Sequence, residues 1–320
     1  MTRLLLSFAL AFSFISPALA APPASFDDAK VVAREKIYND QTHSALGELY
    51  CGCQWEWVGR SGGRLDKRSC GYQTRKQEER AQRTEWEHIV PAWTFGHQRQ
   101  CWQKGGRSFC EKDDPVFNAM EANLFNLYPA VGEVNGDRSN FSYGMVASNA
   151  PQYGQCKTKV DFSEEVAEPR DEVKGMVART TFYMFDRYGL NMSRQQQQLL
   201  MAWNKQYPVS AWEKQRDQRI AAIMGHHNPF VTGQRTWTLD YKPVGDGLVS
   251  PVPTKTAKAA PAASAQVAAS GAIIGNRNSQ LYHLPSGCPG YSQVSAKNQV
   301  SFASEAEAQA AGYKKAGNCR

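Results

Sequence analysis

After its first twenty residues the sequence has no apolar run long enough to cross a bilayer, which takes about 20 consecutive apolar residues. A protein built on membrane-spanning helices is therefore excluded. The chain also lacks a His-Glu-x-x-His segment, in which two histidines one helical turn apart bind zinc, and it has no internal repeat. These absences argue against a zinc-type cell-wall hydrolase and against a repeat protein.

The first twenty residues have the pattern of an export signal. Arg3 supplies a positive start, residues 4–15 form an apolar run, and Ala18-Leu19-Ala20 places small residues at the cleavage site. We expect the mature chain to begin at Ala21, in a periplasmic or secreted protein.

The eight cysteines predict disulfides, because an exported protein meets oxidising conditions. Six of them lie in the first half of the chain, namely Cys51, Cys53, Cys70, Cys101, Cys110 and Cys156. Six cysteines allow fifteen pairings, and the sequence does not choose among them. The expected short loop is Cys101–Cys110, whereas Cys51 and Cys53 each pair elsewhere.

Positive charge is concentrated in one segment of a chain whose net charge is +7. Between Arg60 and Arg83 there are eight Lys and Arg residues and three acidic residues. Such a run favours contact with a polyanion, such as nucleic acid, teichoic acid or anionic lipid. The alternative is a solvated surface loop tied by disulfides.

A stretch rich in Pro, Ala, Ser, Thr and Lys divides the chain, and it lacks the aromatic residues needed for a core. We interpret residues 244–271 as a linker between a large domain at 22–243 and a small module at 272–320.

Helical periodicity predicts four helices, over residues 25–38, 171–188, 193–207 and 210–225. Short strands are expected near residues 49–58 and 87–90, inside a loop-rich and cysteine-tied region. The predicted fold class is α+β, mainly helical, with any catalytic site in that irregular middle region.

A carboxylate and an imidazole are adjacent in the segment Arg83-Thr84-Glu85-Trp86-Glu87-His88-Ile89-Val90-Pro91. Neighbours on a regular strand point to opposite faces, so Glu87 and His88 serve one site only where the strand ends. Pro91 provides such an end. Glu87 offers the oxygen ligands that a hard cation prefers, and a neutral His88 suits proton abstraction from water. The alternative is a histidine that is merely hydrogen-bonded within the fold.

A second segment, residues 120–140, is rich in amides and carboxylates. By default Asn135-Gly136 is a turn and Asp137-Arg138 is a surface ion pair. In the functional alternative, the Asn135 amide oxygen is a second protein ligand of a magnesium ion that bridges to a substrate phosphate.

Two blocks, Glu-Trp-Glu-His-Ile-Val-Pro-Ala at 85–92 and Gly-Glu-Val-Asn-Gly-Asp-Arg-Ser-Asn at 132–140, resemble the bacterial endonuclease I family of periplasmic and secreted nucleases. The resemblance covers most of residues 26–240, including His227-Asn228-Pro229-Phe230. It implies a ββα-metal nuclease core braced by disulfides. It also implies hydrolysis of DNA, and of RNA as well, to 5′-phosphate and 3′-hydroxyl ends.

The resemblance also implies roles for five residues. His88 would be the general base, and Glu87 and Asn135 would hold one Mg²⁺ ion. Arg107 matches the family's phosphate-binding arginine. Glu121 matches a second acidic position, which would order metal-bound water or the site around it.

One position departs from the family pattern. Members of the family often have a histidine where this chain has Phe125. The sequence leaves open whether that position takes part in catalysis or only packs.

No segment has the pattern of a base-reading helix, so contacts with nucleic acid are expected on the phosphate backbone and with little sequence preference. The candidate contacts are Arg60, Arg64, Lys67, Arg68 and Arg138. We expect a monomer.

Residues 272–320 resemble a small Ada-like module. The segments that carry this resemblance are Tyr282-His283-Leu284-Pro285, Cys288-Pro289-Gly290-Tyr291 and Asn318-Cys319. That parent type binds zinc through four cysteines, but here only Cys288 and Cys319 remain, with His283 nearby. We expect a Cys288–Cys319 disulfide as the staple of a small core, with a metal site as the alternative. Its expected task is attachment to nucleic acid or to the cell surface.

An envelope- or polyanion-binding protein without catalysis is the remaining alternative. It does not explain why the positions of Glu87, His88, Arg107, Glu121 and Asn135 all fit one phosphoryl-transfer site. The sequence therefore favours a nuclease.

Overall fold

The computed structural model describes residues 21–148, 150–248 and 273–319, except 286–287, 289, 296–297, 303, 312 and 318. The chain divides into two compact units, at residues 1–257 and 258–320. The predicted export signal and most of the predicted linker lie outside the described residues. Among the described helices, none is long and apolar enough to span a membrane.

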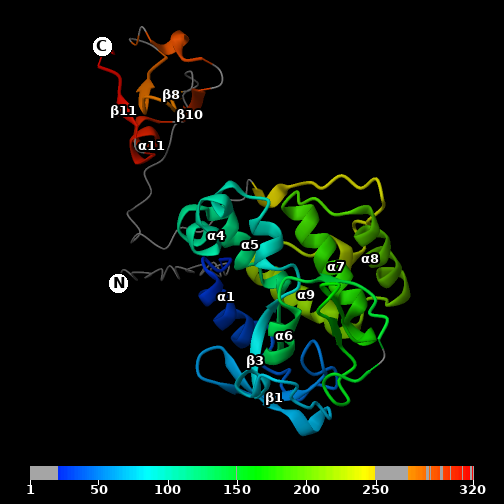
Figure 1. Ribbon diagram of the computed structural model, residues 1–320. Helices are drawn as coiled ribbons and strands as arrows, with labels where there is room; N and C mark the ends of the chain where they lie inside the picture. Colours follow the sequence, from blue (N-terminus) through cyan, green and yellow to red (C-terminus); the bar gives the residue numbers. More distant parts are fainter. Residues whose placement is uncertain are drawn as a thin grey trace, which may run out of the picture. The chain divides into compact units, whose positions relative to one another are not determined.

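The first unit contains a four-stranded antiparallel sheet, in the order β1-β2-β3-β4. Its strands are β1 Gln54–Val58, β2 Gly62–Asp66, β3 Arg83–His88 and β4 Leu127–Val131. Every residue of β4 is buried, and helix α6 (Gly132–Arg138) follows it without a gap. Helix α6 packs against β3, as Figure 1 shows. Two antiparallel strands and the following helix thus form one local ββα unit.

The strand expected near 49–58 is confirmed as β1, whereas the one expected near 87–90 is β3, which begins earlier, at Arg83, and ends at His88 before Pro91. Strand β4 was not predicted. Its sequence, Leu-Tyr-Pro-Ala-Val, is a short apolar run containing proline, and periodicity cannot identify such a run.

Helices cover the rest of this unit. The predicted N-terminal helix is α1 (Phe26–Val32), in which the Asp28 N–H donates to the capping Ser25 hydroxyl, and it continues as a π-helix at Ala33–Ile37. The other three predicted helices are confirmed as α7 Asp171–Arg187, α8 Arg194–Gln206 and α9 Ala211–Met224 (Figure 1). Helix α7 is buried from Val173 to Asp186 and supplies much of the core. The predicted α+β, mainly helical class is correct.

Further helices and turns connect the sheet to these four helices. The helices are α2 Glu78–Ala81, α3 Ala92–Gly96, α4 Gln100–Asp113, α5 Pro115–Glu121 and α10 Pro229–Thr232. There are 3-10 turns at Lys67–Ser69, Leu124–Asn126 and Asp246–Leu248. A small second sheet has the order β5-β7-β6, from β5 Ser142–Tyr143, β6 Lys159–Asp161 and β7 Val166–Glu168.

All eight cysteines are paired, as Cys51–Cys156, Cys53–Cys70, Cys101–Cys110 and Cys288–Cys319. The expected Cys101–Cys110 loop and the expected Cys288–Cys319 staple are confirmed, and Cys51 and Cys53 each pair elsewhere. The Cys51–Cys156 bridge joins segments 105 residues apart. It ties the irregular region after β5 to the turn that precedes β1.

A buried carboxylate organises that turn. Glu48 is fully buried, and its Oε1 accepts from the backbone N–H groups of Cys51 and Cys53 at 2.6 and 3.3 Å. Its Oε2 accepts from Tyr50 N–H and from Val131 N–H at the end of β4, both at 2.9 Å. Burial raises the pKa of Glu48, and the neighbouring Arg170 and the backbone donors oppose that rise. The carboxylate therefore fixes the turn that carries Tyr50 against the central sheet.

The described part of the second unit contains a small sheet in the order β10-β8-β9-β11, the helix α11 and a 3-10 turn at Tyr291–Gln293. Its elements are β8 Ile273–Asn276, β9 Leu281–His283, β10 Gln299–Phe302, α11 Glu305–Ala310 and β11 Lys314–Lys315. Ile273, Tyr282, Phe302 and Ala308 form its core. Such a core is small, and the Cys288–Cys319 bridge reinforces it.

We predict that Glu48→Gln lowers the free energy of unfolding by about 2–4 kcal/mol, because one acceptor oxygen becomes an NH₂ group facing buried N–H donors. Chemical denaturation of the oxidised protein measures this. The control is Glu56→Gln on β1, whose side chain is 69% exposed and pairs with His43, and which should cost no more than about 1 kcal/mol. Equal effects of the two substitutions would contradict the role given to Glu48.

Candidate active site

The end of β3 and the second half of α6 border a cleft of about 380 Å³. Five of the predicted site residues line it: Glu87, His88, Arg107, Asn135 and Arg138. Four aromatic side chains complete its walls, namely Phe26, Trp86, Trp93 and Trp102. The structure thus brings together residues from α1, β3, α3, α4 and α6.

Glu87 is buried at the end of β3 and is hydrogen-bonded through one oxygen only. Its Oε1 accepts from the Tyr50 hydroxyl at 2.8 Å, from Arg138 Nη1 at 2.5 Å and, more weakly, from the Tyr143 hydroxyl at 3.4 Å. No hydrogen bond from the described residues reaches Oε2. Burial raises the pKa of the Glu87 carboxyl, and the positive charge of Arg138 opposes that rise. Glu87 therefore presents one unused oxygen beside a cleft.

Arg138 differs from the exposed groove contact expected from the sequence. It is 2% exposed at the end of α6, and besides Glu87 it donates to the backbone carbonyls of His88 and Ile89. Its guanidinium also lies 4.4 Å from the centre of the Tyr143 ring. Because all these partners are buried, Arg138 positions the end of β3 instead of forming a surface contact.

His88 is oriented so that its two ring nitrogens have different roles. Its Nε2 lies 2.8 Å from the backbone carbonyl oxygen of Glu121, which can only accept, so Nε2 carries the proton. Nδ1 is then an acceptor, and no described residue donates to it. Burial, together with the nearby Arg107, Arg138 and Lys30, lowers the pKa of His88 to about 4. The imidazole is therefore neutral and able to accept a proton near neutral pH.

The backbone next to His88 is clamped by Asn126. The side chain of this buried residue accepts from Val90 N–H at 2.8 Å and donates to the Val90 carbonyl at 2.9 Å. The Ile89 N–H donates to the Asn126 carbonyl at 3.0 Å. These bonds hold the chain in a defined path as it leaves β3, which fixes the direction of the His88 side chain.

Asn135 lies within α6, so the turn expected by default at Asn135-Gly136 is wrong. Its Nδ2 donates to Oε2 of Glu85 on β3 at 3.1 Å. Because a carboxylate only accepts, this contact sets the orientation of the amide and leaves Oδ1 as the free end. Oδ1 has no hydrogen-bond partner among the described residues.

Arg107 and Glu121 form a pair at the edge of the cleft. Glu121 is 2% exposed, and its Oε1 accepts from Arg107 at 2.6 Å, whereas the Arg107 side chain is 44% exposed. No contact of the described residues uses Nη1 of Arg107. Glu121 thus holds the guanidinium through its side chain and orients His88 through its backbone carbonyl.

Phe125 points away from this cleft. It is buried, with its ring 4.6 Å from Tyr183 and 5.7 Å from His226. In this chain the position packs in the core.

The predicted nucleic-acid contacts of the basic segment fall into two groups. Arg60, Arg64 and Arg68 are exposed and form no ion pair within the described residues. Lys67 is half-buried and donates to Glu78 and to Thr74. The first three are therefore available to a polyanion, whereas Lys67 already has partners.

Two tyrosines and four aromatic wall residues were missed by the sequence analysis. Tyr50 and Tyr143 contact Glu87 but lie 37 and 56 residues from it in the chain. Trp86 and Trp93 flank the Glu87-His88 pair in sequence, which was the available signal. For Phe26 and Trp102 no local pattern pointed to the site.

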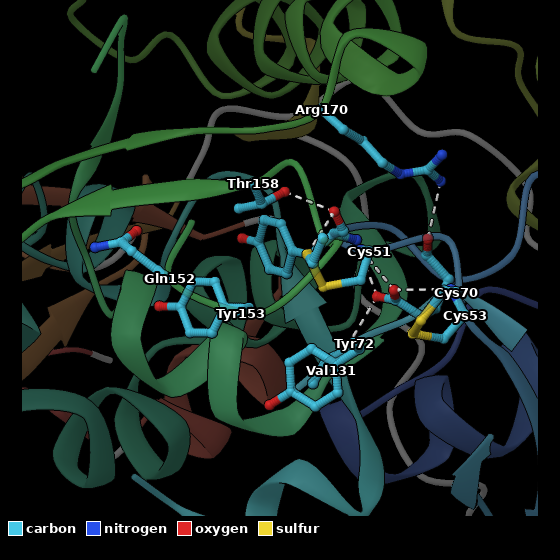
Figure 2. Close-up of a disulfide and its surroundings, with 12 residues drawn as sticks. Cys51, Cys53, Cys70, Tyr72, Val131, Gln152, Tyr153, Thr158 and Arg170 are labelled. Atoms are coloured by element: carbon cyan, nitrogen blue, oxygen red, sulfur yellow. Dashed lines mark hydrogen bonds between the residues drawn. A yellow bond between two sulfur atoms is a disulfide. The ribbon is translucent and has the colours of Figure 1, made fainter. Parts of the chain in front are cut away.

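A disulfide lies next to one of these tyrosines. Figure 2 shows the bridge from Cys51 with Thr158 beside it. The Thr158 hydroxyl donates to the backbone carbonyl of Tyr50 at 2.6 Å. Tyr50 directly precedes Cys51, and its hydroxyl donates to Glu87. The disulfide is therefore linked to the site through Tyr50.

Free acceptor atoms on Glu87, His88 and Asn135, with an exposed arginine beside them, suit a hydrolytic enzyme acting on an anionic substrate. The chain belongs to the Endonuclease I family, whose model matches residues 25–234. It is an endonuclease.

Its relatives agree with this assignment. The chain is 46% identical over 235 residues to an extracellular deoxyribonuclease of Aeromonas hydrophila, covering 73% of this chain and 99% of that protein. It is 45% identical over 197 residues to an Endonuclease-1 of Buchnera aphidicola (subsp. Acyrthosiphon pisum, strain APS), covering 61% and 78%. It is also 43% identical over 231 residues to a periplasmic deoxyribonuclease of Aeromonas hydrophila, covering 72% and 94%. With four disulfides and such relatives, the protein is periplasmic or secreted.

The tail resemblance requires a correction. Residues 251–315 match the model of the ArfC family and are not identified as an Ada-like module. The ligand atoms of His283, Cys288 and Cys319 lie within 4.8 Å of one another, but the two sulfurs are bonded to each other. In this disulfide form neither sulfur is a thiolate.

We predict that replacing Cys51 and Cys156 together by serine lowers plasmid cleavage by at least about tenfold, because Tyr50 loses its anchor beside Glu87. The matched control is the Cys288→Ser, Cys319→Ser pair, which lies in the other unit and should lower cleavage far less, because it leaves Tyr50 and Glu87 in place. Circular dichroism of each variant separates loss of the site from loss of folding. Full activity of a folded Cys51/Cys156 variant would contradict this coupling.

Proposed function

We propose that this endonuclease hydrolyses phosphodiester bonds of DNA, and of RNA, with Mg²⁺ and without sequence preference, leaving 5′-phosphate and 3′-hydroxyl ends. The observation that carries the proposal is the set of unused acceptor atoms at one cleft: Glu87 Oε2, Asn135 Oδ1 and His88 Nδ1. The names of the two Aeromonas hydrophila relatives support DNA as the substrate.

The donor set fits a hard divalent cation. Glu87 supplies a carboxylate oxygen and Asn135 an amide oxygen, and magnesium takes few protein ligands and keeps several waters. When bound there, the ion polarises the phosphate and stabilises the leaving oxygen. Glu85 contributes by fixing the Asn135 amide, and Tyr50 and Arg138 contribute by holding the other Glu87 oxygen.

His88 acts as the general base. Its Nδ1 takes a proton from the attacking water while Nε2 keeps its bond to the Glu121 carbonyl, so the ring does not turn during transfer. The same carbonyl stabilises the positive ring that results. Because burial keeps the imidazole neutral, the base is available without a prior proton loss.

Arg107 binds the phosphate. Its side chain lines the cleft and is 44% exposed, while Glu121 and Glu111 hold the guanidinium through Nη2 and Nε. Arg60, Arg64 and Arg68 extend the contact along the nucleic-acid backbone, which positions the strand without reading bases. The protein acts as a monomer, and the second unit attaches it to nucleic acid or to the cell surface.

The first test is a plasmid-nicking assay on the purified oxidised protein with Mg²⁺ and with EDTA. We expect nicking with Mg²⁺, none with EDTA, and a loss of at least about 100-fold in His88→Ala, because general-base catalysis contributes about 10²–10⁴-fold. His43→Ala, an exposed histidine outside the cleft lining, is the control. Absence of nicking by the wild type in Mg²⁺ would contradict the proposed function. Full activity of His88→Ala would contradict the assignment of His88 as the general base.

A second test addresses the metal ligand. Tyr50→Phe removes the 2.8 Å bond to Glu87, and we expect the Mg²⁺ concentration for half-maximal nicking to rise about tenfold, as for other residues that orient metal ligands. Tyr128→Phe on β4 is the matched control, because its buried hydroxyl contacts Thr180 away from the cleft. An unchanged Mg²⁺ dependence in Tyr50→Phe would contradict the assignment of Glu87 as a ligand.

A further inference from the structure

One wall of the cleft carries an exposed indole that phosphate hydrolysis does not require. Trp93 on α3 is 47% exposed, and it lines the cleft together with His88 and Arg107. Among the exposed large apolar side chains of the described residues it is the only tryptophan.

The Trp93 indole packs against a neighbouring aromatic ring. Its ring lies 4.0 Å from the ring of His97, whose Nδ1 lies 3.2 Å from the Trp93 backbone carbonyl. The His97 ring lies 5.2 Å from that of Trp102. Trp102 fits against Gly96 so closely that a Cβ there would come within 2.0 Å of the indole. Trp93 therefore lies at one end of a row of three packed rings, Trp93, His97 and Trp102. This packing fixes the orientation of the indole in the free protein.

Two cations lie near Phe26, which lines the same cleft. The Arg107 guanidinium is 5.7 Å from the centre of the Phe26 ring, and the Lys30 ammonium is 4.7 Å from it. These positive charges can bind a phosphate, and the exposed indole can stack on a flat aromatic ring. The ligand that offers both groups, a few ångströms apart, is a nucleotide.

We infer that Trp93 forms a nucleobase-stacking subsite beside the phosphate-binding centre. This inference rests on the proposed function and adds a substrate preference to it. Base faces are covered inside a duplex, so the subsite takes an unpaired nucleotide of a single strand or of a locally opened duplex. Stacking on one aromatic side chain then contributes on the order of tenfold in affinity for each base it holds.

The test compares two strands with equal phosphate charge. Fluorescence anisotropy in EDTA measures binding of the full oxidised chain to a labelled oligothymidine and to an abasic strand of the same length, so no cleavage occurs. We expect Trp93→Ala to weaken oligothymidine binding about tenfold and to change abasic-strand binding by less than about twofold. Trp93→Phe should restore most of the loss. Phe162→Ala, an equally exposed aromatic side chain outside the cleft, should change neither strand.

Two outcomes would overturn the inference. Equal weakening of both strands would assign Trp93 to phosphate binding or to folding, and no change on either strand would remove it from the binding site. Because the assay needs no catalysis, either outcome is distinct from failure of the proposed function, which appears as a wild type that does not nick DNA in Mg²⁺.

Discussion

The buried ion pair between Glu87 and Arg138 is the interaction on which the site depends. It connects the last turn of α6 to the end of β3, and the same guanidinium also binds the two carbonyls that follow in the chain. Two charges at 2% exposure are stable only with such partners, because an unpaired buried charge costs several kcal/mol. The pair therefore sets the position of α6 relative to β3, and with it the distance between Glu87 and Asn135.

The region around this pair is irregular, and covalent and polar links replace regular packing there. Glu48 gathers the backbone donors of one turn, and the Cys51–Cys156 bridge ties that turn to a distant loop. These links fix the position of Tyr50, whose hydroxyl in turn holds one oxygen of Glu87. An exported enzyme is suited to this construction, since its disulfides persist in oxidising surroundings. The helices α7, α8 and α9 contribute much of the apolar core, whereas the cleft is lined by residues of α1, β3, α3, α4 and α6.

Much of the architecture was predictable from local pattern. The long helices carry apolar residues at helical spacing and recognisable caps, such as Ser25 before α1 and Gly225 after α9. Strand β3 was located by the residues around Glu87 and by its end before Pro91. By contrast β4, a fully buried edge strand, is a five-residue apolar run with a proline, and only its pairing with β3 makes it a strand.

The sequence by itself determined the family, the export chemistry of the cysteines and the polar residues Glu87, His88, Arg107 and Asn135 of the cleft, because these depend on which residue types occur at which spacing. Tertiary structure alone decided how each side chain is used. Arg138 looked like a surface cation and is buried against Glu87, and Phe125, a departure from the family, packs in the core. It also decided which oxygen of Glu87 and which nitrogen of His88 remain free. Those choices depend on partners 33 to 56 residues away in the chain, whose positions no local pattern encodes.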